Sequence, residues 1–556
     1  MPAAASTSGG SRPRIGRRCD RVASPSRSRR RHRPWRLRRR CRHGQGGRRR
    51  AVVQGSRAQE DGERQILLRG QKIFGNDPIP TVSISAGRHC RRSADPIIRS
   101  LPGETYSKRQ ARLSPKPTTT HRTGSQESYA SRFTAAFLRV RHFALQASAS
   151  ARVYHVTDYG ADPTGATDAT AAINKAIADA FRPPTNATMT GGIPDLGGAE
   201  VHLDGGTYLI KGPLSLPASG GGNFKIHSGS LRASDDFPTD RYLIELSASK
   251  SGGGRSYDYE YATLRDLMLD CSYRGGGVTV VDSLRVAIDN CYVAHFASDG
   301  IAVRGGHETF IRNTFLGQHM TAGGDPGERG FTGTGIHLDG NDNSVSDVVI
   351  FSAATGIMVT APANSISGVH CYNKATGFGG MGIYLKIPGL TQAWISNCYM
   401  DYTSIVAEDP VLLHVSGSFF LGDANVVLKA VNGVARGIQV VGNIFSGRDK
   451  GVDIVQLDGK FTTVDQVYVQ QNSATGMTIK STSARASAEG NGSSWTLDFS
   501  PVLLFPDRIG HVQYSLVAGD EFPGQTLRNV SGNQVVVATD KAVSATVHVL
   551  VDQNSD

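Results

Sequence analysis

The tetrapeptide GIHL at residues 335–338 belongs to a short apolar motif that recurs along the chain. Its other copies read GIAV at 300–303, GIMV at 356–359 and GIYL at 382–385, and more loosely NVVL at 425–428 and GVDI at 451–454. Several intervals between copies are 21–26 residues, and a second element, such as NCY at 290–292 or NIF at 443–445, recurs between them. A period of about 22 residues with two or three strands predicts coils of a right-handed parallel β-helix, an all-β fold.

In such a solenoid each coil pairs its backbone with the coils above and below at a spacing of about 4.8 Å, so equivalent residues form columns. We expect Ile301 and its equivalents to point inward, and the asparagines at the bends to stack as amide ladders. A leucine-rich repeat would need a Leu and Asn pattern that this sequence lacks, and a propeller would need repeats nearly twice as long.

The net charge of +13 is unevenly distributed. Residues 1–150 hold 34 of the 61 Lys and Arg residues but 8 of the 48 acidic residues, which leaves the rest of the chain with a charge of −13. The Arg- and Ser-rich composition of residues 1–150 predicts disorder, because it buries too little apolar surface to offset chain ordering. A basic binding arm, a transit peptide and sequence from a wrong gene model are its possible origins, and we favour the last.

The folded part is predicted to begin near residue 152. A strand at 153–156 and a turn-rich loop precede a possible helix N-cap at Thr167-Asp168, and apolar residues then recur at helical spacing up to Phe181. A helix at 168–181 would cover the open end of the solenoid. We therefore expect a β-helix at 152–493 and, where the period is lost, a separate β element at 494–556. Asp158, Asp162 and Asp168 are expected to hold the loop and the cap.

Cysteine spacing gives no sign of a metal site. The folded part contains Cys271, Cys291, Cys371 and Cys398 without any CxxC pair, so a zinc site of that type is not expected. Disulfides and buried free thiols remain equally open, and Cys271 and Cys291, 20 residues apart, could stack on adjacent coils. We expect neither a metal nor a cofactor.

Strand alternation predicts one chemically active face. If Ile336 points inward, His337 and Asp339 point outward, and the same rule places a mixed set of polar side chains on one exposed sheet. The set comprises Asp299, Arg304, His337, Asp339, Tyr384, Lys386 and Lys429. Acids, cations and an aromatic ring together suit a polyanionic sugar chain. The insertion at 317–333 adds Asp325 and Glu328 as secondary candidates for a cleft wall.

The stretch VTDYGADPTG at 156–165, followed by Asp168 and the Ala/Ile-rich helix, resembles the N-terminal signature of the pectate-lyase-like β-helix superfamily. The resemblance covers residues 152–556 and is greatest to plant polygalacturonases that separate pollen tetrads, which are related to glycoside hydrolase family 28. SDGI at 298–301 partly matches that family's Asn-Thr-Asp motif. GTGI at 333–336 and ATGI at 354–357 lack its Asp-Asp and Gly-His-Gly motifs, and YLK at 384–386 only faintly matches Arg-Ile-Lys.

The resemblance implies hydrolysis of the α-1,4-galacturonan of pectin. In an inverting mechanism one carboxylic acid protonates the leaving oxygen while a second carboxylate activates water. We predict Asp299 and Asp339, with Asp342 as a possible substitute, as the catalytic acids. Arg304, His337, Tyr384, Lys386 and Lys429 are the predicted substrate-binding residues.

Two other functions compete with hydrolysis. A polysaccharide lyase would use Arg304 or a Lys as base, and a non-catalytic carbohydrate-binding solenoid would explain the incomplete motifs. A tailspike is disfavoured because we find no trimerisation stem. We expect a secreted, cell-wall monomer that binds an acidic polysaccharide, with no nucleic acid or membrane partner. Three sequons, at Asn186, Asn491 and Asn529, weakly support secretion.

Overall fold

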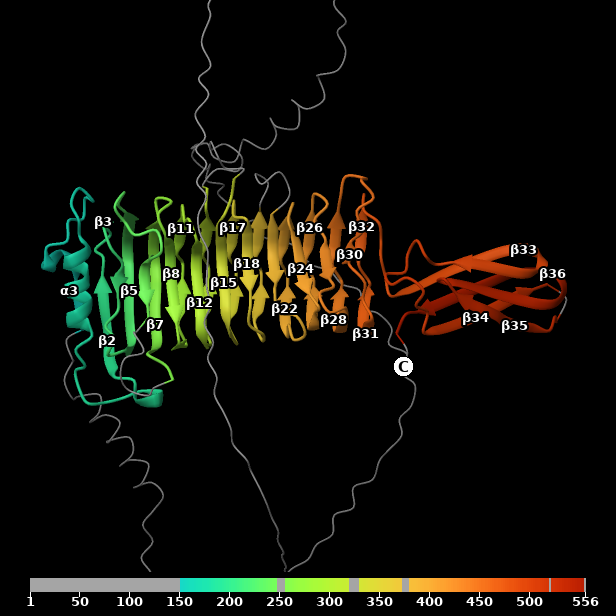
Figure 1. Cartoon of the computed structure of the whole chain (residues 1–556), viewed down its shortest axis with the longest axis horizontal. Coiled ribbons are helices and arrows are strands. Elements are labelled where there is room, and N and C mark those ends of the chain that lie inside the picture. Colours follow the sequence, from blue (N-terminus) through green and yellow to red (C-terminus); the bar gives the residue numbers. More distant parts are fainter. Residues whose placement is uncertain (1–150, 248–255, 320–329, 373–379, 520–521, 555–556) are drawn as a thin grey trace, which may run out of the picture. The chain divides into compact units, whose positions relative to one another are not determined.

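The computed structural model describes residues 151–247, 256–319, 330–372, 380–519 and 522–554. The segment 1–150, predicted to be disordered, and the candidates Asp325 and Glu328 lie outside these ranges. The described chain forms a right-handed parallel β-helix that begins with one α-helix and is followed by a small antiparallel sheet (Figure 1). The predicted fold class is confirmed.

Each coil contributes strands to three parallel sheets, which we number in the order that the chain visits them from β8 onward. Sheet 1 contains β4 (Leu214–Ser215), β6 (Tyr242–Leu246), β8 (Gly276–Val281), β12 (Asp299–His307), β15 (Thr334–Asn341), β18 (Thr355–Val359), β21 (Met381–Leu385), β24 (Ser404–Glu408), β27 (Val426–Lys429) and β30 (Val455–Asp458). A short strand, β9 (Ser283–Leu284), lies at the corner after β8.

Sheets 2 and 3 share two long strands, β5 (Gly221–Ala233) and β7 (Tyr259–Asp270), in the early coils. Sheet 2 also contains β1 (Val153–His155), β2 (Asp195–His202), β10 (Ala287–Asp289), β13 (Phe310–Arg312), β16 (Ser344–Ser346), β19 (Ser365–Ser367), β22 (Ala393–Ser396), β25 (Val411–Ser416), β28 (Val434–Val441) and β31 (Thr463–Gln470). Sheet 3 also contains β3 (Thr207–Ile210), β11 (Tyr292–Ala294), β14 (Phe315–Gly317), β17 (Val349–Phe351), β20 (His370–Tyr372), β23 (Tyr399–Asp401), β26 (Phe419–Leu421), β29 (Ile444–Ser446) and β32 (Ser473–Thr475).

The recurring Gly-Ile motif forms two columns in sheet 1. The register aligns Ile301, Ile336, Ile357 and Ile383, and all four are fully buried, as predicted. The glycine before each isoleucine is required by close approach. A Cβ on Gly335 would lie 2.6 Å from the carbonyl oxygen of Gly356 and 2.8 Å from Cγ2 of Ile350. Successive coils therefore pack too closely at this corner for any side chain.

Amide ladders join coils at the bends. Asn343 Oδ1 accepts from the backbone N–H of Thr309 at 2.9 Å, and Asn364 Oδ1 accepts from that of Asn343 at 3.0 Å. Asn443 and Asn472 continue the same pattern at the bend between sheets 2 and 3. The predicted ladders are thus present, and they satisfy backbone donors that the turns would otherwise bury unpaired.

The first coil is covered by α3 (Thr170–Ala180), which buries Ile173, Ala176 and Ile177 in the common core. The helix is shorter than the predicted 168–181, because α3 begins two residues after Asp168 and ends at Ala180. Between β1 and α3 the chain forms a 3₁₀ turn, η1 (Val156–Tyr159). Asp168 Oδ1 accepts from the backbone N–H of Thr170 at 3.0 Å. A second 3₁₀ turn, η2 (Thr190–Gly192), precedes β2.

The acidic residues of the entry loop organise its backbone. Asp162 accepts hydrogen bonds from the backbone N–H groups of Thr164, Ala166 and Thr167 at 2.9–3.1 Å. Hydrogen bonds from Thr164 and Thr167 strongly lower the pKa of Asp162. These contacts agree with the loop role predicted for Asp162. The helix N-cap is Ala169, which makes no side-chain cap hydrogen bond, and not the predicted Thr167-Asp168. Asp168 instead holds the start of α3 by accepting from the backbone N–H groups of Thr170 and Lys211.

The C-terminal element is an antiparallel sheet of β33 (Ser483–Asp498), β34 (His511–Ala518), β35 (Gln525–Ser531) and β36 (Gln534–Asp552). It begins at Ser483 rather than at the predicted residue 494. Its connecting segment closes the last coil, because Leu504 and Phe505 belong to the solenoid core. Asn554 also exchanges hydrogen bonds with the backbone N–H and C=O of Val467 in β31, at 3.0 and 2.9 Å.

The four described cysteines, Cys271, Cys291, Cys371 and Cys398, are free and buried, which decides between the two open alternatives. Cys271 and Cys291 do not stack. The register pairs Asp270 with Ala294 and Met268 with Tyr292, which places the two thiols at opposite ends of the sheet 3 strands. Burial raises the pKa of Cys291 to about 12 and that of Cys398 to about 11. The described helices include none with the length and apolar character needed to cross a membrane.

The glycine column makes a stability prediction. Replacing Gly335 by Ala inserts a methyl group against a neighbouring backbone carbonyl, and we expect a loss of about 1–3 kcal/mol in unfolding free energy. Urea denaturation followed by circular dichroism measures it. Gly492→Ala is the matched control, because a Cβ at Gly492 has open space. Equal destabilisation by both substitutions would contradict the steric explanation.

Candidate active site

The outward face of sheet 1 carries the predicted polar residues. His337 and Met358 are half-buried there, whereas Ala302 and Tyr384 are buried although their columns face outward. Ala302 is small and flanked in register by Thr279 and His337, and the Tyr384 ring is covered by Lys429. The direction of these side chains was predicted correctly, but the exposure of Ala302 and Tyr384 was not.

Asp299 is held at the amino-terminal end of β12. Tyr242 donates a hydrogen bond from its hydroxyl to Asp299 Oδ2 at 2.8 Å, and Arg304 Nη2 lies 3.6 Å from the same oxygen. The Tyr242 ring reaches across a whole coil because the intervening register position is Gly276, where a Cβ would lie 2.3 Å from the ring. Burial and the charge of Asp299 raise the pKa of Tyr242. The Asp299 side chain is only 14% exposed.

Tyr242 also connects this site to a second carboxylate. Its backbone N–H donates to Glu245 Oε1 at 3.1 Å, and Arg241 pairs with both Glu245 oxygens at 2.8 and 2.5 Å. Sequence reasoning missed Arg241, Tyr242 and Glu245. In the sequence these residues show only as polar positions in and beside an apolar strand. Tyr242 also lies two coils before Asp299, in a part of the chain where the Gly-Ile motif is not visible.

Asp339 lies at the opposite end of sheet 1 from Asp299. The register pairs Asp299 with Thr334 and Asp339 with Arg304, so the two acids are five residues apart along the strands. That offset is about 16 Å, beyond the roughly 6.5–9.5 Å between the carboxyl groups of inverting glycosidases. The predicted pairing of Asp299 with Asp339 is therefore wrong, because adjacent coils do not bring together opposite strand ends.

Asp339 and Asp342 line a common groove of about 550 Å³ at the corner between sheets 1 and 2. His307 and Tyr257 also line it, with His307 Nε2 3.2 Å from the Tyr257 hydroxyl. Thr360 Oγ1 donates to Asp339 Oδ1 at 2.9 Å and lies 3.1 Å from His337 Nε2.

Asp342 occupies the tight turn after β15. It adopts a left-handed backbone, with φ of 57°, and Asn341 donates to its Oδ2 at 2.6 Å. Because Asp342 is three positions after Asp339, their Cα atoms are at most about 10 Å apart.

The groove adjoins an aromatic surface on sheet 2. A neighbouring hollow of about 460 Å³ shares Ala363 and Gln392 with the groove and is lined by Trp394 and His414. The Trp394 and His414 rings stack with centroids 4.0 Å apart, and Trp394 is 54% exposed. Sequence reasoning missed Trp394, although its place one step along the strand from the buried Ile395 would have shown it pointing outward.

Tyr384 and Lys429 are committed to a third carboxylate that the sequence did not suggest, Glu408. The Tyr384 hydroxyl donates a hydrogen bond to Glu408 Oε1, and Lys429 Nζ lies 3.1 Å from that oxygen. Burial opposes ionisation of Glu408, but these two partners outweigh it and lower its pKa. Lys386 lies beside Glu408 in the register and adds positive charge.

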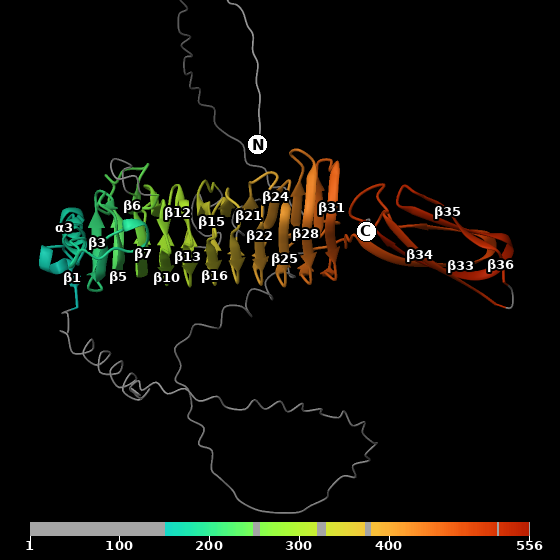
Figure 2. The ribbon, with the colours of Figure 1, turned by 90° about the horizontal axis from the view of Figure 1, so that it is seen from below.

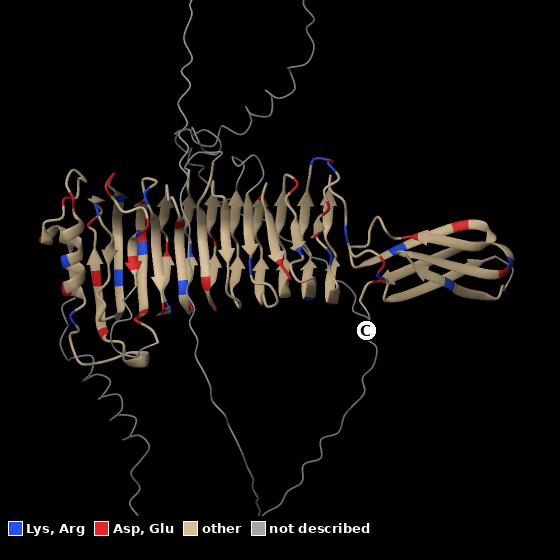
Figure 3. Cartoon of the chain, in the orientation of Figure 1, with Lys and Arg blue, Asp and Glu red and all other residues tan. Residues whose placement is uncertain are grey.

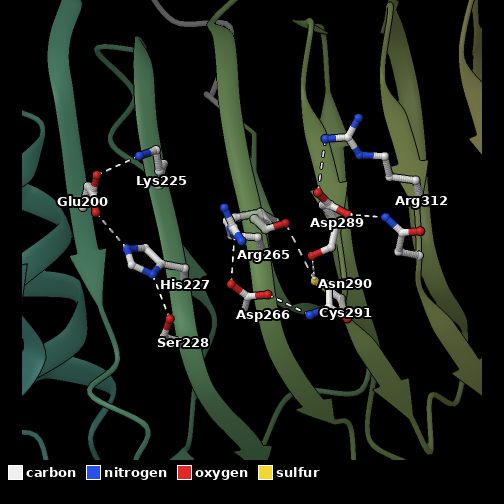
Figure 4. Close-up of polar contacts among 12 residues, drawn as sticks. Glu200, Lys225, His227, Ser228, Arg265, Asp266, Asp289, Asn290, Cys291 and Arg312 are labelled. Carbon is white, nitrogen blue, oxygen red and sulfur yellow. Dashed lines mark hydrogen bonds and ion pairs between the residues drawn. The ribbon is translucent and has the colours of Figure 1, made fainter. Parts of the chain in front are cut away.

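Basic and acidic residues are interspersed along the solenoid (Figure 3). On the outward face of sheet 2, Lys225 pairs with Glu200 at 2.7 Å and Arg312 with Asp289 at 3.1 Å (Figure 4). His227 Nε2 lies 3.2 Å from Glu200 Oε2. These cross-coil pairs act as a surface ladder, so they offer an acidic polysaccharide little unpaired positive charge.

Comparison with known proteins agrees with the fold and the entry signature. Residues 153–379 match the family described as rhamnogalacturonase A/epimerase, pectate lyase-like. The chain is 59% identical over 414 residues to polygalacturonase QRT3 of Arabidopsis thaliana, covering 73% of this chain and 86% of that protein.

Similar solved structures are more distant. ORF18 of Geobacillus virus E2 covers 76% of this chain and 82% of its own, with 12% identity and a TM-score of 0.43. The A-module of the mannuronan C-5 epimerase AlgE6 of Azotobacter vinelandii covers 58% and 98%, with 15% identity and a TM-score of 0.37. At such scores neither bears on the chemistry of this chain. The family match and the 59% identity place the chain in the pectate lyase-like family of β-helix proteins, together with polygalacturonase QRT3.

Proposed function

We propose that the protein hydrolyses the galacturonan of pectin in the corner groove, with Asp339 and Asp342 as the acid and base. The carrying observation is that these two carboxylates line one groove that continues to the exposed Trp394–His414 stack. An inverting hydrolase needs two carboxyl groups flanking the scissile bond, and a sugar chain needs an aromatic surface to rest on. The 59% identity to a protein named polygalacturonase supports this choice of substrate.

Cations beside the groove would bind substrate carboxylates. Arg304 is next to Asp339 in the register, and its side chain stays half exposed although its guanidinium lies 3.0 Å from the Tyr242 hydroxyl and 3.6 Å from Asp299 Oδ2. Lys386 lies two coils beyond Asp339 in the same column. Lys429 and Tyr384 are both engaged by Glu408, and the Tyr384 ring is buried, so we propose that they shape the surface rather than bind uronate directly.

Asp299 supports a second arrangement. It matches the Asp-Gly step of the family 28 motif and is shielded between Tyr242 and Arg304. In that arrangement the hydrolytic centre would lie where the strands of sheet 1 begin, at the first residue of β12. A lyase using Arg304 as the base would occupy the same place. We further propose that the protein is a secreted monomer of the cell wall. The exposure of the sequon residues Asn186, Asn491 and Asn529 supports secretion.

Incubation of the full chain with polygalacturonic acid tests the reaction class. We expect new reducing ends without ultraviolet absorbance, since hydrolysis leaves no double bond. Ultraviolet absorbance rising together with reducing ends would establish a lyase instead. A folded protein that binds the polymer but releases nothing would establish a binding solenoid.

Single substitutions locate the acid–base pair. Asp339→Asn and Asp342→Asn should each lower kcat by about 10²–10⁴-fold, because each removes a proton-transfer group. Asp299→Asn should act mainly on KM through Arg304. Initial rates over a range of substrate concentrations separate these effects. A collapse of kcat in Asp299→Asn, with near-normal rates in the other two variants, would move the centre to the other end of sheet 1.

The aromatic stack should bind substrate without entering the chemistry. Trp394→Ala is expected to raise KM by about 2–10-fold, the loss of one ring contact, with kcat unchanged. Tyr399→Ala is the matched control, because Tyr399 is an exposed aromatic residue on sheet 3, away from the groove. Similar KM values for wild type and Trp394→Ala would remove sheet 2 from the binding site.

A further inference from the structure

Two imidazoles and a carboxylate meet near the first coil, outside the groove and the Asp299 site. The register of β1 and β2 pairs His155 with His202 on neighbouring strands of sheet 2. Asp204 follows β2 in a left-handed turn, with φ of 51°, which brings its carboxylate back toward both rings. Asp204 Oδ1 lies 2.5 Å from His155 Nδ1 and 2.8 Å from His202 Nδ1. The potential ligand atoms all lie within 4.8 Å of one another.

Two groups compete for one ring nitrogen in this arrangement. His202 Nδ1 lies within hydrogen-bond distance of two groups: the backbone N–H of Asp204 at 3.1 Å and the Asp204 carboxylate. A ring nitrogen carries either a proton or a lone pair. If Nδ1 accepts from the N–H, it faces the carboxylate as a second acceptor, and if it donates to the carboxylate, the N–H loses its partner. A cation between Nδ1 and Oδ1 would use the Nδ1 lone pair and remove the acceptor–acceptor contact, and the Asp204 N–H would then pair with solvent.

The surroundings fix the carboxylate as they would in a metal site. Thr157 Oγ1 donates to Asp204 Oδ2 at 2.9 Å, which turns the other oxygen toward the imidazoles. Such outer hydrogen bonds orient metal ligands in proteins. The side chains of His155, His202 and Asp204 are 47%, 29% and 20% exposed, so solvent can complete the coordination.

We propose that His155, His202 and Asp204 form a site for a divalent cation of the zinc class. Two imidazoles and one carboxylate with an open position suit such borderline cations, whereas Ca²⁺ takes six to eight oxygen ligands. Tetrahedral ligands about 2.0–2.2 Å from zinc lie roughly 3.3 Å apart, so binding requires Oδ1 to separate slightly from the two nitrogens. The exposed His155 ring allows that shift. The ion would tie β1 to the first full coil beneath the cap helix.

His227 provides an internal control. It follows His202 in the same register column, and the two rings are 4.8 Å apart. Its two nitrogens, however, contact Glu200 and Ser228 (Figure 4). It is therefore a histidine of the same column that is already engaged outside the proposed site.

The test is isothermal titration of the full, EDTA-treated chain with ZnCl₂, together with Co²⁺ absorption spectra and thermal denaturation. Because other His and Cys residues of the chain can also take up zinc, the criterion is the difference between variants. We expect His202→Gln and Asp204→Asn each to lose one zinc equivalent or at least about tenfold in affinity, and to lose the visible bands of tetrahedral Co²⁺. His227→Gln should match wild type, and Zn²⁺ should raise the wild-type Tm.

Three outcomes would overturn the proposal. These are equal zinc binding by wild type and His202→Gln, loss of binding in His227→Gln alone, or an equal rise in Tm with CaCl₂. Circular dichroism of each variant shows whether it is folded, and Asp204→Asn keeps the size of the side chain should the histidine variants unfold.

Discussion

Main-chain hydrogen bonding between successive coils is the constraint on which the whole structure depends. Each strand pairs in parallel with the equivalent strand of the next coil, so every residue is stacked on a counterpart at about 4.8 Å. Inward columns become continuous apolar rows, and at one corner the backbones approach so closely that only glycine fits, as at Gly335. Outward columns bring chemically different residues into contact, as where Glu408 meets Lys429. The place of a functional side chain on this fold is thus set by two coordinates: the coil to which it belongs and its position along the strand.

The sequence is informative about the first coordinate and much less so about the second. The Gly-Ile motif predicts the solenoid, its inward isoleucines and its outward face, because the repeat and the strand period of two are both visible in the sequence. Pairing Asp299 with Asp339 used the coil number alone and ignored that one acid begins its strand while the other lies near the end of its strand. The boundary at Ser483 was missed for a related reason: alternating residues look alike in a solenoid coil and in an antiparallel strand.

Contacts that span coils were beyond sequence reasoning. Tyr242 reaches Asp299 only because Gly276 leaves room for its ring, and neither residue hints at the other in the sequence. Glu408 likewise gave no signal, yet it holds both Tyr384 and Lys429. The predicted face is therefore less open to ligands than its composition suggests. The groove lies at the edge of this face, at the corner where Asp339 and Asp342 adjoin the hollow lined by Trp394.

The closure of the last coil by the C-terminal element has a consequence for assembly. A solenoid has no intrinsic length, since its terminal strand exposes the same unpaired groups that each coil uses to receive the next. Here the Asn554 side chain takes the place of a peptide group on Val467, while Phe505 fills the end of the core. The C-terminal element therefore ends the stacking of coils, as an end group stops the growth of a polymer. A protein shortened before Ser483 would present an open strand edge able to pair with a second such end, while α3 over the first coil would still block head-to-tail growth into a filament.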